Sequence, residues 1–105
     1  MNHLELSSCI VELSSLRYTP AGIPAINLVL EHESEAIEAG LARQVKLTIR
    51  AVAFGALAEQ AAVLSLGSKF RFTGFLGNAR TSKGVVFHIQ ALCPVSQAEQ
   101  VLNPI

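Results

Sequence analysis

The sequence predicts an all-β fold, a five-stranded Greek-key barrel with a short helix between the third and fourth strands. Apolar and polar residues alternate in five short segments, which is typical of strands with one buried face. Glycine- and proline-containing turns separate several of these segments. One alanine-rich segment of helical character lies between the third and fourth of them. Together these observations favour a small barrel over a layered α/β fold.

Length and composition indicate one domain. Half of the 105 residues are apolar and 15% are charged, which is sufficient for a core and too hydrophobic for a disordered chain. Periodicity is lost after Pro94. We therefore expect a barrel domain over residues 1–95 and a flexible C-terminal tail over residues 96–105.

The first strand is expected within His3–Leu16. Its alternation changes phase near Ser7–Ser8, so we expect a bulge that bends the strand there. The segment Thr19–Gly22 predicts a turn, because its proline presets one dihedral angle and its glycine tolerates positive φ. A second strand is expected to begin at Pro24, where a missing amide donor does least harm.

The next segment, residues 33–41, is rich in charged and polar groups and predicts a connecting loop, with at most a fragment of helix. The third strand has the clearest alternation in the chain. One predicted face carries Val45, Leu47, Ile49 and Ala51, and the other carries Gln44, Lys46, Thr48 and Arg50. This pattern predicts a half-buried strand whose open face holds two cations.

The second half of the chain completes the pattern. Gly55–Leu64 predicts the short helix, Phe70–Phe75 the fourth strand, Gly77–Lys83 a polar hairpin loop and Val85–Gln90 the fifth strand. Three strands, a helix and two further strands, in that order, predict a barrel of the oligonucleotide-binding (OB) type.

Little in the sequence supports catalysis, so we expect no enzyme activity and no cofactor. The chain has no aspartate and none of the common catalytic or phosphate-binding motifs. Glu31, His32 and Glu33 are adjacent, but neighbours in a strand point to opposite faces, so we expect no metal site there. Cys9 and Cys93 are expected to be reduced core thiols, which favours the cytoplasm. No apolar run reaches the ~20 residues that span a membrane.

Binding has more support. Net charge is zero, yet seven of the eight basic residues fall between positions 43 and 83, where only Glu59 opposes them. OB domains bind oligonucleotides on the second and third strands and on two neighbouring loops. Cations there can contact phosphates, and aromatic rings can stack on bases. The candidate single-stranded DNA (ssDNA) residues are Arg17, Tyr18, Lys46, Thr48, Arg50, Arg80 and Lys83.

Aromatic candidates are few. Tyr18 is the one expected exposed ring and Phe75 is a weaker candidate, whereas Phe70, Phe72 and Phe87 are expected in the core.

Several segments resemble the primosomal replication protein N family, known as PriB. They are Thr19–Pro24, Leu28–Ser34, Glu38–Gly40, Arg43–Gln44 and Gly74–Phe75, and the likeness covers residues 2–93. The resemblance implies a bacterial homodimer of OB folds in the replication-restart primosome. It also implies that the protein binds ssDNA, contacts and stimulates the PriA helicase, and hands on to DnaT.

The chain departs from that family pattern at several positions. Lys46 stands where strongly DNA-binding members have a tryptophan, and Glu33 stands where they have an arginine. The lysine-rich last hairpin is shorter here and retains Arg80 and Lys83, while Arg17 matches a basic position of the family. These departures imply weaker DNA binding that depends more on phosphate contacts. The alternative interpretation is an OB-fold protein-interaction adaptor with little DNA binding of its own.

Overall fold

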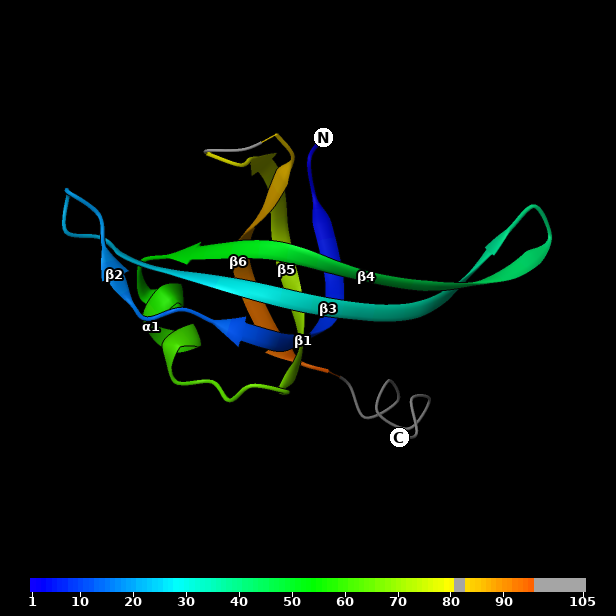
Figure 1. Ribbon diagram of the computed structural model, residues 1–105, viewed down its shortest axis with the longest axis horizontal. Coiled ribbons are helices and arrows are strands. Elements are labelled where there is room, and N and C mark those ends of the chain that lie inside the picture. Colours follow the sequence, from blue (N-terminus) through cyan, green and yellow to red (C-terminus); the bar gives the residue numbers. More distant parts are fainter. Residues whose placement is uncertain (81–82, 96–105) are drawn as a thin grey trace.

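Six strands and one helix form the protein in a computed structural model, which describes residues 1–80 and 83–95 (Figure 1). In chain order they are β1 (Leu4–Leu13), β2 (Arg17–Tyr18), β3 (Pro24–Glu38), β4 (Leu41–Phe54), α1 (Ala56–Ala62), β5 (Lys69–Asn78) and β6 (Val85–Pro94). The five long strands and the helix between β4 and β5 confirm the predicted architecture. The two-residue strand β2 was not predicted.

The barrel closes because β1 pairs on both of its edges. The sheet order is β1-β5-β6-β4-β3-β2, and an additional pairing joins β1 to β3. All pairs are antiparallel except β4–β6, in which Ala51 faces Phe87 and Val52 faces His88. This order is the Greek-key layout of an OB barrel.

The bulge of β1 lies at Val11, not at Ser7–Ser8 as the sequence suggested. Pairing with β5 runs unbroken from Leu4 to Cys9, whereas pairing with β3 shifts register between Ile10 and Glu12. Ser8 is 1% exposed and continues the inward phase that leads to Ile10. A serine at an inward position resembles a change of phase in the sequence, which explains the misplaced bulge.

Aromatic and aliphatic side chains from all five long strands fill the barrel. Phe72 and Phe87 are fully buried, as predicted, and Phe70 packs edge-on to Phe72 at 6.1 Å between ring centroids. The helix α1 packs against β3 and β4 and buries Ala58 and Ala61. Alanines let the helix backbone approach the barrel closely, so α1 closes one end of the core.

The loop expected over residues 33–41 is replaced by a continuous hairpin. β3 and β4 pair without a break from Ala25–Phe54 to Glu38–Leu41. The turn between them is Ala39-Gly40, with φ of 52° and 78°, which is the positive-φ geometry of a two-residue hairpin turn. This part of the hairpin has no buried face, so it lacks the hydrophobic alternation from which strands are recognised.

We define the arm as the part of this hairpin formed by residues 31–48. It projects from the barrel in Figure 1 and lies along the longest dimension of the molecule, which measures 49 × 30 × 23 Å. Strand residues from Glu33 to Glu38 and from Leu41 to Gln44 are exposed on both faces.

Residues 4–94 hold all the strands and the helix of the barrel. The predicted flexible tail, residues 96–105, lies outside the described residues. Among the described helices, none has the length and apolar character needed to cross a membrane.

Candidate nucleic-acid interface

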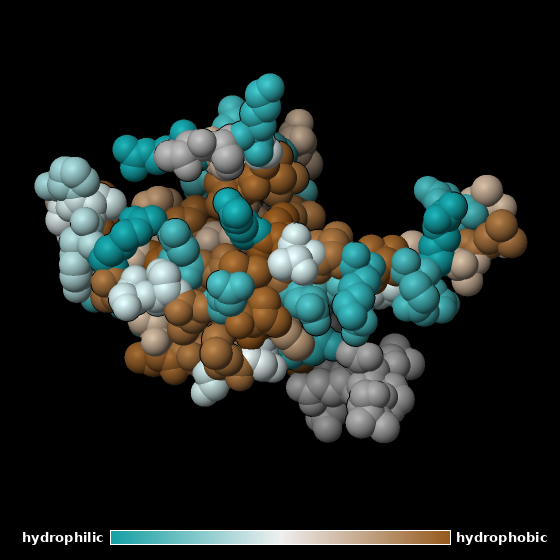
Figure 2. Space-filling model, in the orientation of Figure 1, coloured by the Kyte–Doolittle hydropathy of each residue, from teal (hydrophilic) through white to brown (hydrophobic). Residues whose placement is uncertain are grey.

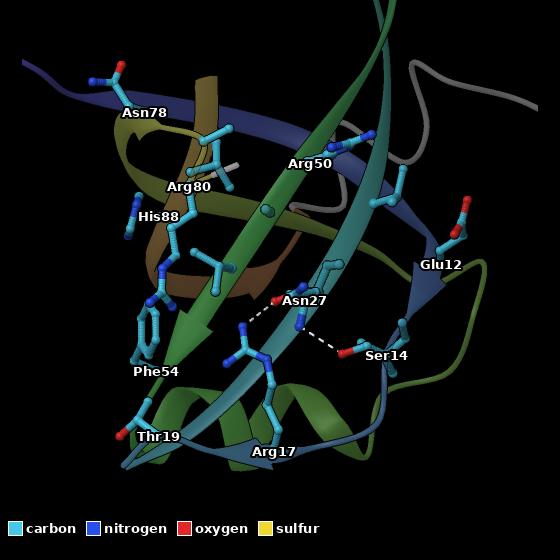
Figure 3. A pocket seen from close by; sticks show the side chains of 17 residues that line it. Glu12, Ser14, Arg17, Thr19, Asn27, Arg50, Phe54, Asn78, Arg80 and His88 are labelled. Carbon is cyan, nitrogen blue, oxygen red and sulfur yellow. Dashed lines mark hydrogen bonds between the residues drawn. The ribbon is translucent and has the colours of Figure 1, made fainter. Parts of the chain in front are cut away.

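A cleft of about 580 Å³ lies on the outer face of β3 and β4, between β2 and the β5–β6 hairpin (Figure 3). Side chains alternate across these strands, so Asn27 and Val29 of β3 face outward beside Val52 and Arg50 of β4. Ala79 and Val86 supply part of the opposite wall. The cleft therefore occupies the face on which OB domains bind oligonucleotides.

Three arginines from three different parts of the chain line this cleft. Arg17 comes from β2, Arg50 from β4, and Arg80 from the turn after β5. The Arg17 Nη2 atom donates a hydrogen bond to Asn27 Oδ1 at 2.8 Å. The backbone N–H of Asn27 donates to Ser14 Oγ at 2.9 Å (Figure 3). Among the described residues of the lining, Glu12 is the one acid. The cations outnumber it, so the cleft favours an anionic ligand.

Three rings form a stack beside the arginines. The His88 ring lies 4.7 Å from the Phe75 ring with an interplanar angle of 7°, and 6.2 Å from the Phe54 ring with an angle of 23°. Phe54 and His88 line the cleft, and Phe54 is 44% exposed. Gly77 makes room for His88, because a Cβ atom there would stand 2.9 Å from His88 Nε2. A partly exposed aromatic ring of this kind can extend the stack with a nucleobase.

Phe54 and His88 were missed in the sequence. Phe54 continues the outward phase of Lys46, Thr48 and Arg50, and His88 has the outward phase on its own strand. That alternation was the available signal. The proximity of the two rings depends on the parallel pairing of β4 with β6, which periodicity does not reveal.

The seven predicted site residues separate into two groups. Arg17, Arg50 and Arg80 meet at the cleft. Tyr18 is 63% exposed and is not among the residues that line the cleft. Lys83 is exposed and is likewise absent from the lining. The structure thus brings three of the predicted residues together.

Lys46 and Thr48 lie on the arm, where acids surround them. Lys46 Nζ is 3.7 Å from Glu33 Oε1, and Thr48 is opposite Glu31 in the register of β3 and β4. Glu35 lies on the same face, opposite Gln44. Figure 2 shows hydrophilic side chains along the arm. A phosphate would meet carboxylates here as well as the one ammonium.

Both ring nitrogens of His32 have a hydrogen-bonding partner. Its Nδ1 is 2.6 Å from the Ser7 carbonyl oxygen, and its Nε2 is 2.8 Å from Ser34 Oγ. Glu31 and Glu33 point to the opposite face of β3, as alternation requires. Among the described residues, no group of three or more histidine, cysteine or acidic side chains could hold a metal ion.

The two thiols are half-buried instead of fully enclosed in the core. Cys9 and Cys93 are both free. Arg71 Nη2 lies 3.7 Å from Cys93 Sγ on the outer face of β5 and β6. The expectation that both cysteines are core residues is therefore met only in part.

Comparison with known proteins identifies the relatives of this chain. A family model described as "Another single-strand binding protein family" matches residues 2–91. The replication restart protein PriB of Bordetella pertussis is 50% identical over 91 residues, which cover 86% of this chain and 85% of that protein. The solved structure of PriB from Ralstonia solanacearum has a TM-score of 0.82 and 39% identity, and the match covers 90% of this chain and 97% of that one.

A more distant structure shows the same fold. The single-stranded DNA-binding protein of Thermus aquaticus matches with a TM-score of 0.73 and 22% identity over 94% of this chain and 52% of that one.

Proposed function

The chain belongs to the PriB family of single-strand binding proteins, and from this premise we propose that it binds ssDNA in its cleft during bacterial replication restart. One observation carries the proposal. Arg17, Arg50 and Arg80 line the same cleft as the stacked rings of Phe54 and His88. Phosphates need cations and unstacked bases need flat apolar rings. The cleft has cations and aromatic rings in the same lining.

The arginines and the rings have separate tasks in this proposal. The guanidinium groups neutralise the backbone and can each donate two parallel hydrogen bonds to a phosphate. Phe54 receives a base on its exposed face, with His88 and Phe75 supporting it from behind. Neither contact depends on base identity, so binding tolerates any sequence. The role is binding, with no chemical step.

The base-stacking position of this chain differs from the one that the family resemblance implied. Lys46 takes the place of a tryptophan and sits beside Glu33 on the arm. Phe54 lies four residues beyond Arg50 on the same face of β4 and offers an alternative aromatic ring at the barrel end of the strand. We propose that stacking has moved from the arm to the cleft.

The proposed assembly is a homodimer that acts in the cytoplasm with the PriA helicase, which it stimulates, and with DnaT. Residues Leu4–Ser8 of β1 pair with β5 on one side, and pairing with β3 starts only at Cys9. Within the described residues, the other edge of Leu4–Ser8 pairs with no strand. A second copy could extend the sheet there. Light scattering should give twice the 11.2 kDa chain mass, and a monomer at micromolar concentration would contradict the dimer.

The binding proposal is tested with two alanine variants on the same strand face. Arg50→Ala removes a cleft cation and Lys46→Ala removes an arm cation four residues away. Affinity is measured with a labelled oligothymidylate of about 30 nucleotides, long enough for more than one OB-fold site. Arg50→Ala should weaken binding about fivefold and Lys46→Ala less than twofold. Equal losses, or a larger loss for Lys46→Ala, would place the DNA on the arm.

A further inference from the structure

The arm is a paired two-stranded projection that is tied to the barrel at its root. Its two strands stay paired in one register out to Glu38–Leu41. His32 ties its base to β1 through the Ser7 carbonyl and to its own strand through Ser34. A two-stranded ribbon without a core contributes little stability of its own. The projection is therefore not explained by stability of the fold, and contact with another molecule is a role that suits it.

The charge of the arm selects against nucleic acid. Residues 31–48 hold four glutamates and two cations, and each cation is already paired, Arg43 with Glu38 at 2.6 Å and Lys46 with Glu33 at 3.7 Å. Glu31 and Glu35 have no cationic partner among the described residues. The net charge of −2 repels phosphates and complements a basic surface.

The tip of the arm is apolar. Ile37 is 71% exposed and Leu41 is 69% exposed, and they lie near the Ala39-Gly40 turn on opposite faces of the ribbon. Ala36 and Ala42 beside them are also exposed. In Figure 2 hydrophobic side chains appear at the far end of the arm beyond the hydrophilic ones. Large aliphatic side chains on a projecting hairpin can act as anchors that fill a pocket on a protein partner.

We propose that the arm is a protein-docking element, separate from the DNA cleft. Its apolar tip enters an apolar pocket of the partner, and lysines and arginines around that pocket meet the glutamates of the shaft. The choice of the PriA helicase as this partner rests on the proposed function, which already includes a helicase contact. The placement on the arm rests on the exposed Ile37 and Leu41 and on the charge pattern.

The test compares two arm variants with a cleft variant, each in the full chain. Ile37→Thr/Leu41→Thr removes the apolar tip and places a β-branched threonine, which favours strands, at both positions. Glu31→Gln/Glu35→Gln removes the unpaired charges at nearly constant shape. Arg80→Ala is the matched cleft variant. Binding to purified PriA without DNA, binding to labelled oligothymidylate, and solution mass are measured for each protein.

The tip variant should weaken helicase binding about tenfold and leave DNA affinity within about twofold. The glutamine variant should weaken helicase binding about threefold and reduce its salt dependence. Arg80→Ala should show the reverse pattern, with DNA affinity reduced and helicase affinity kept.

Several results would overturn the proposal. Helicase binding by both arm variants at the wild-type level would remove the arm from the interface. Loss of DNA affinity in the tip variant would make the arm part of the DNA site, and a changed mass would make it a contact between copies. A wild-type protein that binds DNA but not the helicase would also overturn the docking assignment, while the DNA proposal would stand.

Discussion

The cleft and the arm are both built on β3 and β4, yet their chemistry is opposite. At the barrel end, Arg50 lies beside Val29, and two further arginines approach from other elements. At the arm end, Lys46 lies beside Glu33 and Arg43 beside Glu38. The number of cations is similar in the two regions. What differs is whether a carboxylate stands next to each cation.

This difference shows that the position of a cation in the strand register matters more than its presence in the sequence. A carboxylate within 4 Å cancels most of the field that a phosphate would feel. The arginines of the cleft lie around a concave surface with rings in its wall, where a strand of DNA can meet several of them at once. The arm offers single cations that are already neutralised.

The largest expected effect separates the two regions by stability. Phe72 is fully buried in the barrel, so Phe72→Ala should lower the free energy of unfolding by ~3–5 kcal/mol. Leu41 is 69% exposed at the arm tip, so Leu41→Ala should change it by less than ~0.5 kcal/mol. Urea denaturation followed by circular dichroism measures both. A large loss in Leu41→Ala would show that the arm contributes to the core of an assembly.

The second effect separates the regions by their salt dependence of DNA binding. The variant Arg50→Ala/Arg80→Ala should lose ~2 kcal/mol of binding free energy, about 30-fold in affinity. Its plot of log affinity against log salt should become shallower by ~1.4, because two phosphate contacts are lost. The matched arm variant, Arg43→Ala/Lys46→Ala, should keep the wild-type slope. A flattened slope in the arm variant and an intact one in the cleft variant would reverse the assignment.

The third effect isolates the ring wall of the cleft. Phe54→Ala should weaken ssDNA binding by about tenfold, or ~1.4 kcal/mol, because one stacked base loses its platform. Phe54→Tyr should restore most of the affinity, since the ring face is kept. Because stacking is not ionic, the salt slope should stay unchanged in Phe54→Ala. Equal affinity in Phe54→Ala and wild type would remove the ring stack from the DNA site.

The smallest effect concerns the acids of the arm. Glu33→Gln leaves Lys46 without its carboxylate partner and removes one negative charge, so DNA affinity should rise by less than about twofold, or ~0.4 kcal/mol, at low salt. Gln44→Glu on the same face should lower it slightly. The gain should vanish near 0.3 M salt if it is electrostatic. No gain at low salt would mean that bound DNA passes too far from the arm to sense its charge.

The sequence predicts the barrel well because buried strands leave a regular pattern. The alternation around Ile49, Phe72 and Phe87 marks inward positions, and these side chains do pack in the core. The same reasoning fails where a strand has no buried face, so it predicts a loop at residues 33–41, where the arm has paired strands. It fails again at Ser8, a buried polar residue that imitates an outward position.

The site was harder to predict than the fold. Arg17, Arg50 and Arg80 could be chosen from their places in the expected elements, and they do meet at the cleft. The Phe54–His88 stack depends on the pairing of Val52 with His88 across two strands far apart in the chain. The register of β4 with β6 is set when the barrel closes, and the periodicity of either strand alone does not predict it. Pairing of Lys46 with Glu33 likewise required the register of β3 and β4.

The most direct test of the division between cleft and arm is a nuclear magnetic resonance titration of the isotope-labelled full chain with oligothymidylate. An oligomer of about 15 nucleotides covers one OB-fold site. The amides of Asn27, Arg50, Phe54 and His88 should shift most, while those of residues 33–46 should stay in place. The largest shifts within residues 33–46, with the cleft unperturbed, would contradict the account.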